Sequence, residues 1–92
     1  MNSEKELLQQ MIDANKAFTF VTKTLKHADK EHMAEDVKKI LPIFMRQFYQ
    51  LDRLTNRFIE LTGNKELQEN MDGIRSDAYA LKERMETIYG TV

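Results

Sequence analysis

Apolar residues recur at alternating spacings of three and four along three separate segments of the chain, and this periodicity constrains the fold more than any other feature. In the first segment the repeating residues are Leu7, Met11, Ala14, Phe18, Val21, Leu25 and Ala28. Such spacing places them within a stripe about 100° wide on one side of an α-helix. The pattern predicts a helix over about residues 4–27, a turn at 27–30, and Asp29 as the N-cap of the next helix.

The second segment carries a broader apolar face. Its main stripe consists of Ile40, Phe44, Phe48, Leu51, Leu54, Phe58 and Leu61. Leu41 and Ile59 widen the stripe on one side and Ile43 on the other, to a span of roughly 160°. A helix with so wide an apolar face is expected to contact two neighbours. The segment over about residues 30–62 is therefore predicted to be the middle helix.

Pro42 interrupts this middle helix. Proline lacks a backbone N–H and clashes with the carbonyl four residues earlier, so a helix containing it kinks or breaks. The apolar register continues across the proline, which favours a kink. The alternative is a break into two helices, which would give four helices in all.

The third segment repeats the 4-3 spacing without interruption through Gly73. Its stripe consists of Leu67, Met71, Ile74, Ala78, Leu81, Met85 and Ile88. Gly63 is predicted to end the middle helix and Asn64 to cap the next one. Because short connections between long helices lead to antiparallel packing, we expect an all-α, up-down-up three-helix bundle over residues 1–92, one domain, with its long middle helix kinked or broken at Pro42.

The apolar stripes also predict the core. The residues expected to be nearly fully buried are Phe18, Leu25, Phe44, Phe48, Leu51, Phe58, Met71, Ile74 and Leu81.

Groups that perform chemistry are scarce. The chain has no cysteine and only three glycines, and its only serines are Ser3 and Ser76. Nucleophilic catalysis needs an activated side chain beside a base, and a phosphate-binding loop needs clustered glycines. The acidic residues lie off the apolar stripes, so a buried acid–base pair is not expected either. These observations predict a protein that is not an enzyme, with no catalytic residue and no cofactor.

A metal site is not expected. His27 and His32 lie among acidic residues around the first predicted turn. Their spacing matches neither HExxH nor the paired Glu-x-x-His motifs of di-iron bundles. The acids in this region are instead typical of a helix N-terminus, where they interact favourably with the helix dipole.

The N-terminal residues, MNSEKELLQQ, are charged and lack the apolar stretch of a signal peptide. No window approaches 18 consecutive apolar residues, so no membrane span is expected. Both features favour a cytoplasmic location.

Net charge is −1, but residues 38–61 carry five basic residues against two acidic ones. Four of these basic residues share one narrow side of the middle helix: Lys39, Arg46, Arg53 and Arg57. Two interpretations remain open. They could pair with Glu66, Glu69, Asp77 and Glu83 of the third segment, or they could contact a partner, since arginine suits carboxylates and phosphates.

Four large side chains lie off the apolar stripes, and aromatic residues beside arginines are typical of binding hot spots. The hypothetical partner-binding residues are Phe20, Met45, Arg46, Tyr49, Arg53, Arg57 and Tyr79. We therefore expect a protein–protein interaction protein (an adaptor, chaperone, inhibitor or regulator) whose partner is another protein or a second copy. A nucleic-acid-binding module is the alternative, although no net basic domain or helix-turn-helix supports it. A metal or small-molecule site within the bundle is the third.

Overall fold

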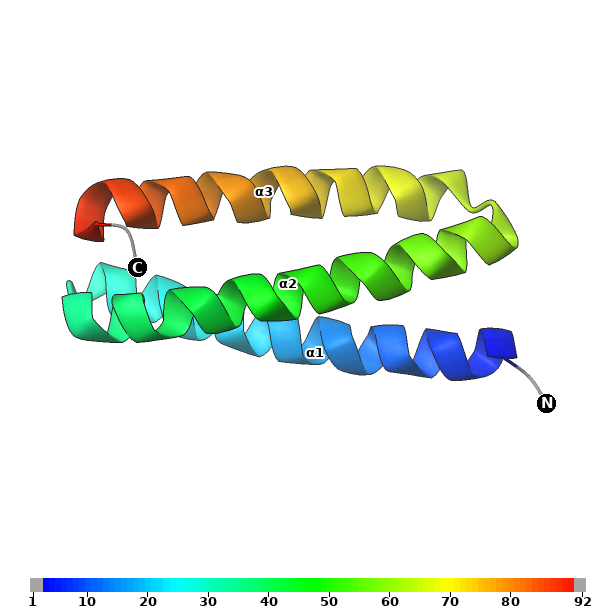
Figure 1. The fold of residues 1–92 in the computed structure, drawn as a ribbon, viewed down its shortest axis with the longest axis horizontal. Helices are drawn as coiled ribbons and strands as arrows, with labels where there is room; N and C mark the ends of the chain where they lie inside the picture. The colour runs from blue at the N-terminus through cyan, green and yellow to red at the C-terminus, as the bar shows by residue number, and fades with distance from the viewer. Residues whose placement is uncertain (1–2, 91–92) are drawn as a thin grey trace.

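The computed structural model describes residues 3–90 and contains three α-helices: α1 (Ser3–Lys30), α2 (Ala34–Thr62) and α3 (Lys65–Tyr89). No strand occurs in these residues. The helices run up, down and up, so α1 and α3 point the same way and α2 runs against both (Figure 1). The all-helical class and the number of helices are as predicted.

Helix α2 is the central element, because it packs along both α1 and α3. Its fully buried residues include Phe44 and Phe48, with 1% and 0% of their surface exposed. The ring of Phe18 in α1 lies 5.3 Å from that of Phe44 and 6.1 Å from that of Phe48. The wide apolar face of the middle segment is thus explained by two packing partners.

Helix α2 is continuous from Ala34 to Thr62, with Pro42 inside it and exposed. The alternative of two separate helices is therefore not found in the described part of the chain. A bend of the helix axis at Pro42 stays a prediction.

The turn between α1 and α2 lies later than predicted, at residues 31–33 rather than 27–30. Helix α1 ends with His32 in the left-handed conformation (φ 55°), and the N–H groups of His32 and Met33 donate to the carbonyls of Asp29 and Ala28. This is the Schellman arrangement. Asp29 consequently lies within α1 and does not cap α2, contrary to prediction.

The second turn follows the sequence prediction. Gly63 takes the left-handed conformation (φ 67°) and its N–H donates to the carbonyl of Ile59. The Asn64 side chain accepts a hydrogen bond of 3.0 Å from the N–H of Leu67, which caps α3. Gly73 lies inside α3, so the helix continues through it.

Most of the predicted core is buried: Leu25, Phe44, Phe48, Leu51 and Met71 are at most 4% exposed. The remaining predicted core residues are only partly buried: Phe18, Phe58, Ile74 and Leu81. The prediction of near-complete burial was wrong for these four, because a third helix covers them only in part.

Candidate functional site

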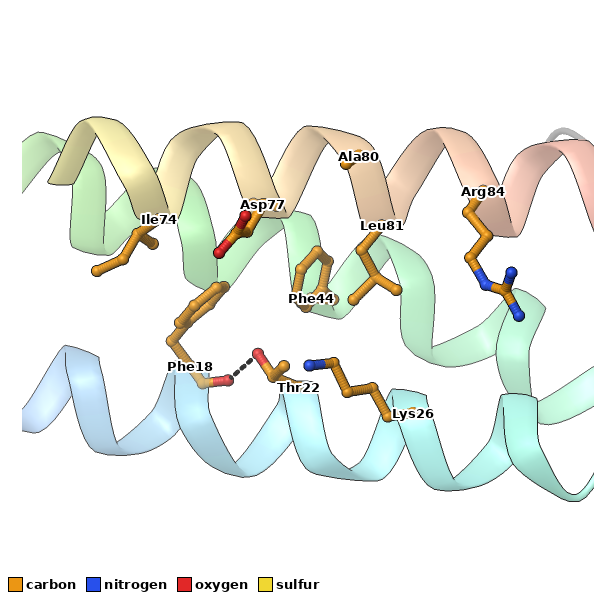
Figure 2. A pocket seen from close by; sticks show the side chains of 10 residues that line it. Phe18, Thr22, Lys26, Phe44, Ile74, Asp77, Ala80, Leu81 and Arg84 are labelled. Atoms are coloured by element: carbon orange, nitrogen blue, oxygen red, sulfur yellow. Dashed lines mark hydrogen bonds between the residues drawn. The ribbon is translucent and has the colours of Figure 1, made fainter. Parts of the chain in front are cut away.

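A groove runs between α1 and α3, and three of the four partly buried core residues line it. In the part of the groove nearer the C-terminal ends of α1 and α3, Phe18 projects from α1 and Leu81 from α3. Phe44 of α2 forms the floor there (Figure 2). This half of the groove has a volume of about 410 Å³.

The second half of the groove continues toward the N-terminal end of α1 and has a volume of about 370 Å³. Its walls carry Leu8 and Ile12 of α1 and Leu67 of α3, and its floor is Leu51 and Thr55 of α2. Ile74 lines both halves, so they adjoin along the bundle, and together we call them the interhelical groove.

The rim of the interhelical groove bears several charges. Lys16 and Lys26 stand on the α1 side, and Asp77 and Arg84 on the α3 side. Arg84 bonds to Asp29 at 3.3 Å, whereas the other three form no ion pair within residues 3–90. The rim is therefore basic on the α1 side.

Thr55 is the one polar residue among the fully buried side chains of the described chain, with 2% of its surface exposed. Four of the other helical threonines donate their hydroxyls to the carbonyl four residues earlier: Thr22, Thr24, Thr62 and Thr87. The Thr55 hydroxyl makes no hydrogen bond to any described residue. Because no buried side-chain nitrogen or oxygen atom of the described residues lacks a partner, this hydroxyl oxygen is reached by solvent. The floor of the interhelical groove thus holds a hydroxyl that no described residue bonds.

On the opposite side of α2 lie the arginines that the sequence singled out. Arg46, Arg53 and Arg57 are exposed and form no ion pair with the described residues. Of the two interpretations left open by the sequence, pairing with acidic residues of α3 is thus not found among the described residues. The ion pair between α2 and α3 has the opposite arrangement of charges: the acidic residue, Asp52, is on α2 and the basic residue, Arg75, is on α3, at 2.6 Å.

Two of the predicted aromatic residues come together from different helices. Tyr49 of α2 and Tyr79 of α3 are 50% and 45% exposed, and both rings lie 5.6 Å from the ring of Phe48. Hydrogen bonding with the Tyr49 hydroxyl is the main cause that raises the pKa of Tyr79 above its ordinary value of 10.0. We call Arg46, Tyr49, Arg53 and Arg57 the outer face of α2, beside which Tyr79 of α3 lies.

The other two predicted residues do not join this outer face. Met45 is 7% exposed and belongs to the core cluster, so a partner has no access to it. Its placement beyond the apolar stripe was wrong, because packing of α3 against α2 widens the buried arc on that side. Phe20 is 72% exposed on α1 and makes no ring contact with the described aromatic residues.

Within the part of the chain that the structure describes, no three His, Asp or Glu side chains are grouped to hold a metal ion. None of the described helices is long and apolar enough to cross a membrane.

Sequence reasoning missed the interhelical groove because its lining is indistinguishable from core by periodicity. The available signal was the pair Leu8 and Ile12, which lie just outside the stripe of the first segment and are 42% and 41% exposed. Comparisons of the chain with protein-family models, with curated proteins and with solved structures found no match.

Proposed function

We propose that the protein is a non-enzymatic protein–protein interaction module of the cytoplasm, acting as an adaptor, chaperone, inhibitor or regulator, and that it binds its partner in the interhelical groove. The observation that carries the proposal is the partial burial of Phe18, Ile74 and Leu81. Their positions in the apolar stripes are those of core residues, yet the three helices leave them accessible. Exposed apolar surface of this kind is typical of an interaction site.

The test compares two isoleucines that are equally exposed on different surfaces. Ile12 lines the interhelical groove, whereas Ile43 lies on α2 outside it, and each is 41% exposed. Tagged wild-type protein, Ile12→Gln and Ile43→Gln are used to purify bound proteins from the native cell, and these are quantified by mass spectrometry. Ile12→Gln should reduce recovery of the specific partner about tenfold, through lost burial of an apolar side chain.

Ile43→Gln should recover the partner as wild type does. Circular dichroism serves as the folding control, and all three proteins should melt at similar temperatures. Equal recovery by both variants would place the partner elsewhere and contradict the proposal.

A second candidate surface is the outer face of α2, whose arginines beside Tyr49 and Tyr79 form no ion pair within residues 3–90. This face would bind a partner or a second copy. The double variant Tyr49→Ala with Arg53→Ala should weaken that complex about tenfold, or about 1.4 kcal/mol, and leave the melting temperature nearly unchanged. Light scattering and a pull-down measure it, and an unchanged complex would exclude this face.

Nucleic-acid binding by the same arginines is the remaining alternative. Phosphate contacts would make such binding fall steeply with salt concentration. We expect no complex with DNA or RNA tighter than about micromolar at physiological salt, because the domain has no net basic charge. A nanomolar complex with DNA or RNA that Arg46→Glu abolishes would favour nucleic-acid binding over protein binding.

A further inference from the structure

We infer that the interhelical groove binds a fourth helix, supplied by a partner protein: an amphipathic helix of about five turns, with acidic residues along its flank, that runs parallel to α2. This inference rests on the proposed function and adds to it the chemistry and the direction of the ligand.

The length of the interhelical groove fits a helix. The lining residues extend from Leu8 to Lys26 on α1 and from Leu67 to Arg84 on α3. At 1.5 Å per residue both walls are about 26–27 Å long, which matches a helix of about 18 residues.

The walls also favour a helix over an extended peptide. Both are α-helices, whose backbone N–H and C=O groups are bonded within each helix. They offer no sheet edge to which an extended chain could pair its own backbone. A helix satisfies its backbone internally and presents an apolar stripe to a groove, so only a helix avoids leaving polar groups unpaired here.

Charge indicates what flanks that apolar stripe. Lys16 and Lys26 stand on the α1 rim and form no ion pair with the described residues, and Arg84, which is paired with Asp29, stands on the α3 rim. Asp77 is the one acidic side chain among the lining residues. Glutamates or aspartates beside the apolar stripe of the ligand would complement this rim, whereas lysines would be repelled by it.

Helix dipoles indicate the direction. Lys26 and Arg84 stand near the C-terminal ends of α1 and α3, which lie at the same end of the bundle (Figure 1). Helix C-termini carry partial negative charge and favour the positive N-terminus of a neighbour. A ligand helix that begins at this end is antiparallel to α1 and α3, as in an up-down-up-down bundle. Acids in its first turn would then face Lys26 and Arg84.

Thr55 adds one polar requirement. Its hydroxyl lies on the groove floor, makes no hydrogen bond to a described residue and is reached by solvent, so a ligand that covers it must supply an acceptor or a donor. We therefore expect one polar residue within the apolar stripe of the ligand, near the level of Thr55.

Two synthetic peptides of about 18 residues test the inference. They share a leucine-rich stripe with one central glutamine and differ only at the flanking positions, which are glutamate in one and lysine in the other. Binding of each fluorescently labelled peptide is measured by anisotropy at low and at physiological salt. The glutamate peptide should bind about tenfold more tightly than the lysine peptide, and the difference should shrink as salt rises.

Charge reversal on the protein provides the matched control. Lys16→Glu with Lys26→Glu should remove or invert the preference for the glutamate peptide. Arg46→Glu with Arg53→Glu changes the net charge by the same amount on the opposite side of α2 and should leave the preference in place. Loss of preference in both double variants would mean a long-range charge effect and would overturn the inference.

Thr55→Val is the variant for the groove floor. It should weaken binding of the glutamine-containing peptide while leaving binding of an all-leucine counterpart no weaker. Equal effects on the two peptides would contradict a polar contact at Thr55.

A nitroxide at the N-terminus of the peptide reports the direction. It should broaden the NMR signals of residues near Lys26 and Arg84, and broadening near Leu8 and Leu67 would overturn the parallel-to-α2 orientation. Sedimentation of the protein without peptide tests whether a second copy of the chain occupies the groove instead. A dimer that Ile12→Gln dissociates would identify a second copy in the groove and overturn the inference.

Equal affinity for both peptides, lost in Ile12→Gln, would refute the acidic chemistry and leave the proposed function standing. Binding of neither peptide would refute a helical ligand. The comparison of Ile12→Gln with Ile43→Gln in cell extracts decides the proposed function independently of both results.

Discussion

At the scale of single residues, a histidine occupies a position that favours glycine, and a glycine occupies a position that favours a residue with a side chain. His32 adopts the left-handed conformation, φ 55°, that glycine adopts most readily. Gly73 lies inside α3, where it costs helix stability, and a Cβ atom built on it would meet no other atom within 4 Å.

Exchanging the residue type at each position should therefore stabilise the fold. His32→Gly relieves the left-handed strain, and Gly73→Ala removes the entropy cost of glycine in a helix. We expect each change to raise the free energy of unfolding by about 0.5–1 kcal/mol, measured by urea denaturation. His32→Ala keeps the strain and serves as the control, with little gain. A decrease for Gly73→Ala would mean that this position is closely packed.

The Asp29 carboxylate at the end of α1 is held by two side chains of α3. It accepts a hydrogen bond of 2.7 Å from the Tyr89 hydroxyl and one of 3.3 Å from Arg84. The Tyr89 hydroxyl, followed by Arg84, lowers the pKa of Asp29 below its ordinary value of 3.8, against the opposing effect of burial. These contacts tie the C-terminal end of α3 to that of α1.

A lowered pKa means that the folded protein favours ionised Asp29. The resulting stability is present above the unfolded pKa, near 3.8, and is lost as pH falls through the folded value. Tyr89→Phe should melt at a lower temperature than wild type at neutral pH, and this gap should narrow in acid. Tyr79→Phe, on the same helix but away from Asp29, should show no such narrowing. Parallel melting curves against pH for wild type and Tyr89→Phe would contradict the assignment.

At the scale of the helix, α2 combines the widest buried face with the one proline of the chain. Pro42 cannot donate a hydrogen bond to the carbonyl of Lys38, and its ring is exposed. Val37 and Leu41, on the N-terminal side of Pro42, are nevertheless 1% and 4% exposed. The first two turns of α2 thus pack against the bundle despite the missing bond.

Replacing the proline separates local from tertiary effects. In a helix interior, proline is about 3 kcal/mol less favourable than alanine. We expect Pro42→Ala to gain less, about 1–2 kcal/mol, because a straighter α2 must repack Val37 and Leu41. Urea denaturation measures the gain, and NMR structures of both proteins compare the helix axes. A wild-type axis that is straight through residue 42 would refute the predicted kink.

At the scale of the whole molecule, the core has one centre, at Phe48. Phe48 is 0% exposed and contacts aromatic rings from all three helices: Phe18, Tyr49 and Tyr79. Phe20 is the same residue type with 72% of its surface exposed. The two phenylalanines therefore form a matched pair for measuring how much the centre contributes.

Phe48→Ala should lower the free energy of unfolding by about 3–5 kcal/mol, since it removes a buried ring and leaves a cavity. Such a loss is a large part of the stability of a small domain. Phe20→Ala should change it by less than about 0.5 kcal/mol. Thermal and urea denaturation measure both. A Phe48→Ala protein that melts within a degree or two of wild type would contradict the arrangement of the bundle.

The helices and their order could be predicted from the sequence, because the 4-3 spacing and the end signals act within a few residues. Asn64 caps α3 through Leu67, three residues away, and Gly63 ends α2 through Ile59, four residues away. The end of α1 was misplaced because His32, and not a glycine, takes the left-handed position that ends the helix. The Asp29 side chain, expected to cap α2, accepts instead from Tyr89, which is distant in sequence.

Only the tertiary structure decided which apolar residues are covered and which surface charges find partners. Periodicity gives the same signal for Phe48, which is enclosed by three helices, and for Phe18, which lines the groove between two of them. In the same way, spacing along α2 shows that its arginines share a side but does not show whether α3 reaches them. Burial and pairing depend on the lateral distance between helices, which is set by packing across the whole molecule. The candidate site lies in the space between α1 and α3. The apolar pattern of each helix alone does not reveal that space.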